Sequence, residues 1–262
     1  MSTGYSYYES CLDIDIISKV KALLINGGYH LRESDGKISA KKHLGWETPW
    51  HHVRHSGDLD CGLWHKVIFD VISMALPADR RFVPSECQDC YKVVIRPKTL
   101  KQLFAVLDMQ KAMSSPCKCG IETRPTVHGL YGGYWYNRGL SQGLERYKEV
   151  RALAGANRHL GPEVKVILKR ACTEFEFACG PSDKWRITDE QIALEALVNR
   201  TFERDIINWV QPEWAIAYIH RKWIEWAYQN GDATYSDFTG GKPLYPEYVT
   251  YHHLSDGVEL YE

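Results

Sequence analysis

The sequence lacks any apolar run approaching the roughly 20 residues that span a bilayer, so we expect no membrane-spanning helix. Its start, MSTGYSYYES, has no basic segment followed by an apolar one and therefore predicts no secretory signal. HExxH and the Cx₃Cx₂C triad are absent, as are a Walker loop and GxGxxG. These absences leave no signature of a zincin protease, a radical-SAM enzyme, a P-loop nucleotidase or a Rossmann enzyme.

Disulfide scaffolding is also excluded by composition. Eight cysteines in 262 residues are too sparse for a small secreted scaffold. With no export signal, reduced thiols and a cytoplasmic location are the better interpretation. The hydrophobic content of 44% and the charged content of 25% are those of an ordinary folded protein.

Charge of either sign is nearly balanced overall, because the formal net charge is −1, but it is unevenly distributed. Residues 91–170 contain 15 Lys and Arg against 5 Asp and Glu, whereas residues 171–262 contain 7 against 16. A basic middle followed by an acidic end predicts either a polyanion-binding surface or pairing between the two segments.

The chain divides by pattern into three segments. We expect a mixed N-terminal segment over 1–86, a basic α+β core over 87–180, and a helical C-terminal region with a wrapping tail over 181–262. The middle segment alternates strand and helix signals. The elements expected there are a strand over 91–96, a helix capped by Thr99 and Gln102, a strand over 117–123, a helix over 141–154 and a strand over 164–177. This β-α-β-α-β order predicts a small ferredoxin-like sheet.

The most informative motif consists of four cysteines in two closely spaced pairs, Cys87 with Cys90 and Cys117 with Cys119. Four soft ligands on two turns are typical of a structural zinc site, and an iron–sulfur cluster is the alternative. The second pair is CxC and not the commoner CxxC, so ordinary thiols remain the third interpretation. A further candidate metal set, whose spacing matches no closed zinc pattern, consists of His51, His52, His55, Cys61 and His65.

The segment from Tyr131 to Gly139 combines glycines with aromatic residues. We interpret it as a glycine-flanked turn in which Tyr134, Trp135 and Tyr136 stack on a base, or else pack on the sheet. Cations that would contact phosphates surround it in the sequence. The ligand-binding residues predicted are Lys92, Arg96, Arg124, Tyr134, Trp135, Arg138, Lys169 and Arg170.

Two acidic residues in the expected last strand, Glu174 and Glu176, would share one of its faces. They could bind a cation or share acid–base chemistry, but a salt-bridged surface beside Lys169 and Arg170 is the simpler interpretation. In the C-terminal region, Trp and Tyr residues crowd two expected helices, one from Asp189 to about Val210 and the next after Pro212. They either pack in the core or contact a protein partner.

Together these patterns predict an intracellular, metal-stabilised α+β protein whose basic middle binds a phosphate-bearing ligand, with nucleic acid as the first candidate. An iron–sulfur redox enzyme and a nucleotide-acting enzyme are the enzymatic alternatives. A structural subunit of a larger assembly is the third.

Overall fold

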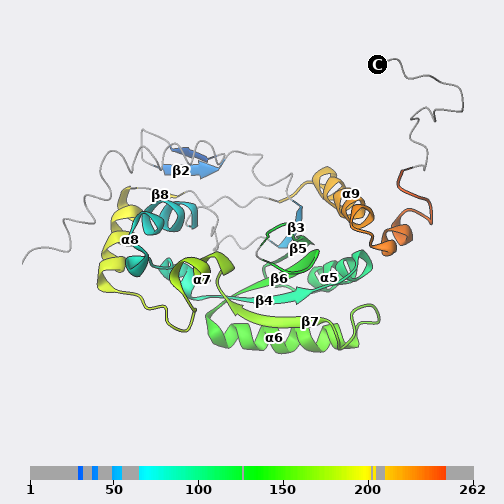
Figure 1. Cartoon of the computed structure of the whole chain (residues 1–262), viewed down its shortest axis with the longest axis horizontal. Coiled ribbons are helices and arrows are strands. Elements are labelled where there is room, and N and C mark those ends of the chain that lie inside the picture. The colour runs from blue at the N-terminus through cyan, green and yellow to red at the C-terminus, as the bar shows by residue number, and fades with distance from the viewer. Residues whose placement is uncertain are drawn as a thin grey trace, which may run out of the picture.

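The fold was obtained as a computed structural model, which describes residues 29–31, 37–40, 49–54, 65–125, 127–201, 203–204 and 210–245. It is a mixed helix and strand structure built on a five-stranded antiparallel sheet with the strand order β3-β5-β6-β4-β7 (Figure 1). The bounds of these strands, in sheet order, are Trp50–Arg54, Cys117–Ile121, Tyr131–Arg138, Cys90–Arg96 and Lys165–Arg170.

Two long helices connect the strands. Helix α5 (Leu100–Ala112) joins β4 to β5, and α6 (Gly139–Ala156) joins β6 to β7. The expected cap of α5 is present, because the Thr99 side chain accepts a hydrogen bond from the backbone N–H of Gln102. The order is thus β4-α5-β5-β6-α6-β7, with one strand more than the sequence predicted. The additional strand is β6, which the sequence pattern had suggested to be a turn.

Side chains on alternate positions of the strands separate the core from the opposite face of the sheet. Val93 and Ile95 on β4 and Tyr131 and Trp135 on β6 are fully buried among residues of α5 and α6. Their neighbours in sequence point to the other face. Cross-strand pairing fixes which residues share each face, since Val93 lies opposite Trp135 on one side and Leu168 on the other.

Helix α9 (Glu213–Gln229) completes the main core beside α5 and the edge strand β3. Ile219, Trp223 and Ala227 are fully buried on one side of this helix. Asp232, just after α9, accepts hydrogen bonds from Tyr131 Oη at 2.8 Å and from the backbone N–H of Leu100 at 2.5 Å. These bonds join the end of α9 to the start of α5 and to β6, and the 3₁₀ helix η4 (Ala233–Phe238) follows.

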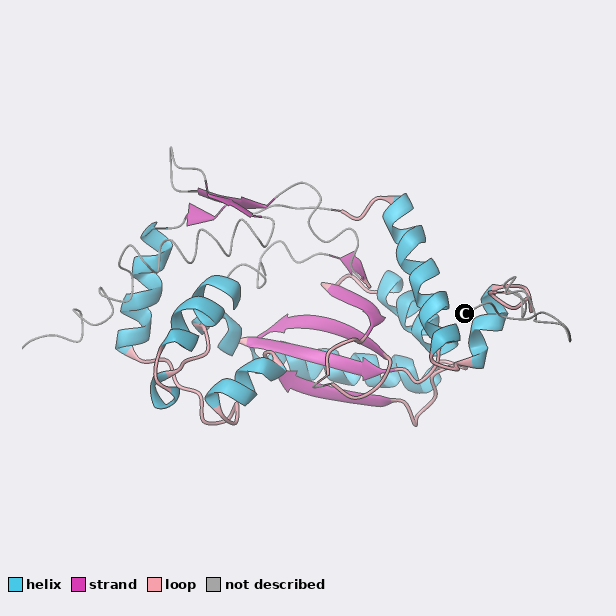
Figure 2. Cartoon of the chain, turned by 45° about the horizontal axis from the view of Figure 1, so that its top comes forward, coloured by secondary structure: helices cyan, strands magenta, loops and turns pink. Residues whose placement is uncertain are grey.

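Helices α7 (Thr173–Cys179) and α8 (Asp189–Thr201) lie at the other end of the molecule from α9 (Figure 2). A second hydrophobic cluster lies at this end. It contains Phe69, Val83, Cys87, Phe175 and Trp185. The elements that form this end are the π-helix η1 (His65–Ile72), the 3₁₀ helices η2 (Ser73–Ala75) and η3 (Ala78–Arg80), and the helices α4 (Ser85–Gln88), α7 (Thr173–Cys179) and α8 (Asp189–Thr201).

Helix α7 replaces the second half of a strand that the sequence predicted over residues 164–177. The strand ends at Arg170 because Ala171 adopts a left-handed conformation with φ 49°, which turns the chain away from the sheet. Helix α8 is also shorter than expected, since it ends at Thr201 and not near Val210.

A small separate sheet has the strand order β1-β2-β8, with β1 at Tyr29–Leu31, β2 at Lys37–Ala40 and β8 at Glu203–Arg204. The helix suggested by the sequence near residues 13–24 falls outside the described residues. Among the helices that the structure describes, none is long and apolar enough to cross a membrane.

Gly133 on β6 lies where helix α5 packs closely on the sheet. A Cβ atom at this position would lie 2.6 Å from Val106 Cγ1 and 2.8 Å from Ile95 Cγ2. We expect Gly133→Ala to lower the free energy of unfolding by about 1–3 kcal/mol through overpacking. Gly155→Ala in α6 is the matched control, because among the described residues no atom beyond its chain neighbours and the backbone of its own helix lies within 4 Å of its added Cβ. Gly155→Ala should raise the free energy of unfolding by up to about 1 kcal/mol, measured by urea unfolding. Equal effects of Gly133→Ala and Gly155→Ala would contradict the close packing of α5 on Gly133.

Candidate functional site

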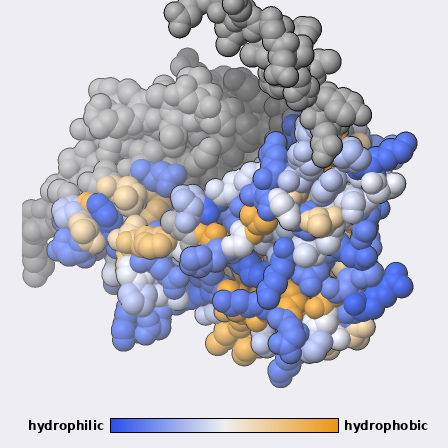
Figure 3. All heavy atoms as spheres, turned by 45° about the vertical axis from the view of Figure 1, so that its right-hand side comes forward, coloured by the Kyte–Doolittle hydropathy of each residue, from blue (hydrophilic) through white to orange (hydrophobic). Residues whose placement is uncertain are grey.

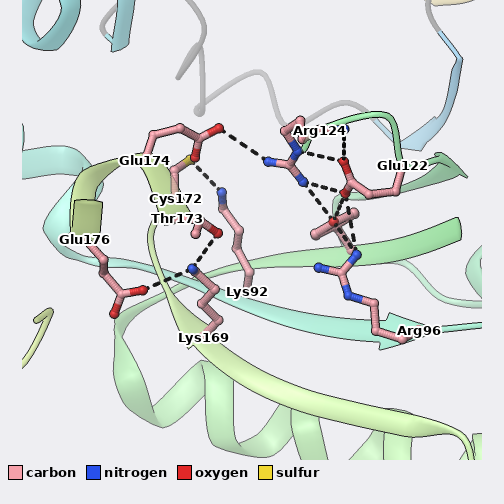
Figure 4. Close-up of polar contacts among 10 residues, drawn as sticks. Lys92, Arg96, Glu122, Arg124, Lys169, Cys172, Thr173, Glu174 and Glu176 are labelled. Carbon is pink, nitrogen blue, oxygen red and sulfur yellow. Dashed lines mark hydrogen bonds and ion pairs between the residues drawn. The ribbon is translucent and has the colours of Figure 1, made fainter. Parts of the chain in front are cut away.

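The sheet face opposite α5 and α6 gathers cations from strands far apart in sequence. On β4 and β7, Lys92 lies directly opposite Lys169, and Arg96 lies directly opposite Lys165. Figure 4 shows Lys92, Arg96 and Lys169 projecting from the sheet on the side away from α6. Like charges placed directly opposite each other destabilise a sheet, so this placement carries a cost unless nearby anions offset it.

We call this surface the basic face. It comprises Lys92, Arg96, Lys118, Tyr134, Tyr136, Lys165 and Lys169 on the sheet, together with Arg124 from the loop after β5. Four of the sequence-predicted residues lie on its strands, namely Lys92, Arg96, Tyr134 and Lys169, and a fifth, Arg124, lies beside them.

A buried carboxylate organises one end of the basic face. Glu122 is 4% exposed and receives hydrogen bonds from Arg124 Nε at 2.8 Å, Arg124 Nη2 at 2.7 Å and Tyr134 Oη at 2.7 Å. Arg96 Nη1 lies 3.5 Å from Glu122 and donates to Tyr134 Oη at 2.9 Å. One carboxylate therefore holds two guanidinium groups and a phenol in fixed positions.

This network sets the ionisation of its members. Burial alone would raise the pKa of Glu122, but the hydrogen bonds from Arg124 and Tyr134 outweigh burial and hold the pKa at about 2. The hydrogen bond to Glu122 raises the pKa of Arg124, and burial is the main cause that raises the pKa of Tyr134. At neutral pH the cluster therefore contains two cations, one anion and a neutral phenol.

Helix α7 lies against the other end of the basic face (Figure 4). Lys169 Nζ donates to Thr173 Oγ1 at 2.7 Å and lies 3.2 Å from Glu176 Oε2, and Glu174 lies 3.5 Å from Arg124. Lys92 Nζ donates to Cys172 Sγ at 2.9 Å. Glu174 and Glu176 thus act as anionic partners of the face, and they come from a helix instead of the predicted strand.

Aromatic rings accompany these cations. Lys92 lies over the ring of Tyr136, with Nζ 5.6 Å from its centroid, and Lys118 lies over Trp50 at 4.9 Å. The rings of Tyr136 and Trp50 are half-buried, whereas that of Tyr134 is 6% exposed. Tyr136 and Trp50 are accordingly the rings that a planar ligand could stack upon.

Three predicted ligand-binding residues lie elsewhere. Trp135 is fully buried beneath the sheet, so the stacking role predicted for it is incompatible with the fold. Arg170 also points away from the basic face: its side chain donates to the carbonyl oxygens of Gln88 and Ser182 and lies over the Trp185 ring. Arg138 is exposed at the end of β6, where it lies 4.0 Å from Glu86.

The four thiols predicted to share one zinc ion or iron–sulfur cluster do not come together. Cys117 and Cys119 lie in the main core, and Cys87 lies in the second cluster. Strand β6 separates β4 from β5, and Cys90 pairs with Arg138 of β6 while Cys117 pairs with Trp135. In the part of the chain that is described, no three His, Cys, Asp or Glu side chains are grouped to hold a metal.

The environment of these thiols is that of ordinary core residues. Burial raises the pKa of Cys117 to about 11 and raises that of Cys119 well above its usual value. Both are therefore protonated thiols at neutral pH. Metal ligation requires thiolates, and burial outweighs the nearby cations Arg54 and Lys111 that would favour that form at these two positions.

Of the second predicted metal set, His55 and Cys61 fall outside the described residues, and the side chain of His65 is not described. His52 lies on β3, where its backbone N–H donates to Gln211. His51 meets a residue that the sequence did not associate with it: its Nδ1 lies 3.0 Å from Nε2 of His220 on α9. Burial is the main cause that lowers the pKa of each ring to about 4, with further contributions to His51 from His220 and to both from Lys111.

This histidine pair predicts acid sensitivity. Because the folded-state pKa values lie near 4, below the usual 6.5, the unfolded chain binds more protons between these values. The contribution of the pair to stability should therefore be complete above about pH 6.5 and should be lost as the pH falls towards 4, by on the order of 3 kcal/mol for each ring. Urea unfolding at several pH values measures this. His220→Gln should flatten the decline, whereas His128→Gln at an exposed site should leave it unchanged, and a decline retained in His220→Gln would contradict the assignment.

The aromatic residues of the C-terminal region divide between core and surface. Trp223 is fully buried, whereas Trp214 on the same helix is 58% exposed and Tyr218 is 44% exposed. Trp209 is not among the described residues. Figure 3 shows mostly hydrophilic residues on this side of the molecule, with small hydrophobic patches among them. A protein partner on α9 stays a prediction.

Comparison with known proteins gives no similarity to build on: no family model, no curated protein and no solved structure matches this chain. The geometry of the basic face is therefore the basis for a functional conclusion.

Proposed function

We propose that this protein binds single-stranded nucleic acid on the basic face. The observation that carries the proposal is the pairing of Lys92 with Lys169 and of Arg96 with Lys165 on one side of adjacent strands. Repulsion between such cations is offset when a phosphate backbone neutralises them. The face has six cations and three acidic neighbours, Glu122, Glu174 and Glu176, so the balance favours a polyanion.

A surface that binds single-stranded nucleic acid also needs rings on which bases can stack, and two aromatic side chains supply them. Bases of a single strand stack on exposed rings with little sequence preference. Tyr136 on β6 and Trp50 on β3 flank the cation Lys118, which lies between their strands on β5. Phosphates on the cations and bases on these rings would place an extended strand across the sheet.

The arrangement of elements supports the same conclusion. We propose that β4-α5-β5-β6-α6-β7 is the ferredoxin-like β-α-β-β-α-β arrangement, with β3 added at one edge. In RNA-recognition modules a four-stranded sheet presents aromatic residues on which two or three bases stack. In this chain the cations and the half-buried rings of Tyr136 and Trp50 lie on the face opposite the two connecting helices, although Lys92 and Tyr134 on that face are themselves buried.

Binding to a labelled single strand of about 15 thymidines, followed by fluorescence anisotropy, tests the proposal. If three or four phosphates are neutralised, log Kobs should fall with log salt concentration with a slope of about −2 to −3. Lys165→Ala and Lys169→Ala should each reduce that slope by about 0.7. No detectable binding at low ionic strength would overturn the proposal.

Two control variants make the test specific. Lys101→Ala removes a cation on α5, where Lys101 pairs with Asp237, and it should leave the affinity and the slope unchanged. Glu176→Gln removes the carboxylate that lies 3.2 Å from Lys169 and should tighten binding, because the phosphate no longer competes with it. An equal loss of affinity in Lys101→Ala and Lys169→Ala would show that the nucleic acid is attracted non-specifically to any cation on the surface.

A further inference from the structure

A cavity of about 270 Å³ lies at the start of helix α8, away from the basic face. Its volume is close to the lower end of the range for small-molecule sites, about 300–1,000 Å³. The walls come from η3 and the segment after it, from α4 and α7, and from residues 184–191. The cavity therefore lies between elements that meet only in the folded chain.

The cavity is lined by more cations than anions. Arg80, Arg81, Lys184 and Arg186 line it, against Asp79 and Glu190. Arg81 Nε donates to the carbonyl oxygen of Leu76, and Arg186 Nη1 donates to those of Asp183 and Trp185. These acceptors are neutral, and within the described part of the chain no carboxylate contacts Arg81 or Arg186. Their positive charge is thus available to an anion, and the amino end of α8 adds to it.

Gln191 gives a second and independent indication of a ligand. This side chain lines the cavity and is 2% exposed. Its Nε2 donates to the carbonyl oxygen of Val83 at 2.9 Å and to Glu195 Oε1 at 2.8 Å, so the orientation of the amide is determined by two acceptors. Its Oε1 is buried and has no hydrogen-bond partner among the described residues. A buried acceptor of this kind is satisfied by a molecule that brings an N–H or O–H group.

We propose that this cavity binds a small molecule that carries both a phosphate group and a hydrogen-bond donor, the chemistry of a 5′-mononucleotide. The arginines hold the phosphate by charge-assisted hydrogen bonds, and Gln191 Oε1 accepts from the donor. This site does not depend on the nucleic-acid proposal, because it shares no residue with the basic face.

Isothermal titration calorimetry with each of the four 5′-ribonucleoside monophosphates, and with the matching nucleosides, tests the cavity. At least one monophosphate should bind. The affinity of the matching nucleoside should be at least tenfold lower, because the phosphate contacts are lost. Arg81→Gln and Arg186→Gln should each lower the affinity for that monophosphate by about tenfold or more. Arg186 is at an exposed position. Lys101→Ala is the charge-matched control and should bind like the unaltered protein.

Two results would overturn the proposal. One is the absence of saturable binding by any of the four monophosphates up to about 10 mM. The other is binding that survives both Arg81→Gln and Arg186→Gln. If such binding were lost in Lys169→Ala, the nucleotide would be on the basic face, which would support the proposed function while excluding the cavity.

Discussion

Trp135→Ala should lower the free energy of unfolding by about 3–5 kcal/mol, since it removes one of the two fully buried tryptophan side chains of the main core. Its indole Nε1 has no hydrogen-bond partner among the described residues, so the loss is one of packing and apolar burial. Denaturant unfolding at neutral pH measures it. The folded fraction of the variant should retain its affinity for single-stranded nucleic acid.

Tyr136→Ala is the matched comparison, one residue further along β6 and on the opposite face of the sheet. It removes a half-buried ring beside Lys92 and should change the melting temperature little. Losing one stacked base should weaken nucleic-acid binding by roughly tenfold or more. If Trp135→Ala instead lowered affinity while preserving stability, the assignment of the two faces of β6 would be reversed.

Helices α5 and α6 and most strands of the middle segment were predictable because local signals determine them, whereas α7 was predicted as part of a strand. The side-chain cap of Thr99 on Gln102 appears in the structure, and strand β4 differs from its predicted start by one residue. Strand β6 was not predictable in the same way. Gly132 and Gly133 resemble a turn, and the close packing of Val106 from α5 and of Ile95 from β4 explains a glycine at position 133 within a strand.

Because the sequence pattern suggested a turn where β6 lies, it also predicted that the four cysteines would share one metal site. The spacing of the two thiol pairs is typical of a metal site only if their strands are neighbours. Because β6 lies between β4 and β5, Cys90 and Cys117 belong to strands about 10 Å apart, whereas two thiolates on one zinc ion lie about 4 Å apart. Strand order is a property of the whole sheet, and no local pattern around a cysteine carries it.

The candidate site was predictable in its charge and not in its geometry. A basic middle segment is visible in the composition, and Lys92, Arg96 and Lys169 were identifiable from it. That Lys165 also belongs to the face follows from its pairing with Arg96, which requires the register of β4 and β7. The alternation of residues 165, 167 and 169 is the one local signal that could have indicated it. Glu122, which organises the face, was missed because an isolated acid in a basic segment has no motif.

Glu122→Gln should lower the free energy of unfolding by about 3 kcal/mol or more, because it leaves Arg96 and Arg124 close together without their shared anion. The shape of the side chain is nearly preserved, so the effect reports charge and hydrogen bonding. In the unaltered protein the same contribution is present above the usual pKa of about 4.5 and is lost as the pH falls towards 2. This range lies mostly below that of the histidine pair, so acid titration of unfolding separates the two.

Glu174→Gln provides the control on the same arginine. Glu174 lies 3.5 Å from Arg124, but its side chain is 39% exposed, whereas that of Glu122 is fully buried. Water screens the exposed pair, so its removal should cost less than about 1 kcal/mol. Each variant removes one carboxylate charge that lies beside Arg124. Glu122 differs from Glu174 in being buried and in also contacting Arg96 and Tyr134. A comparable loss of stability in both, or a loss in Glu122→Gln below about 1 kcal/mol, would show that Glu122 does not organise the basic face.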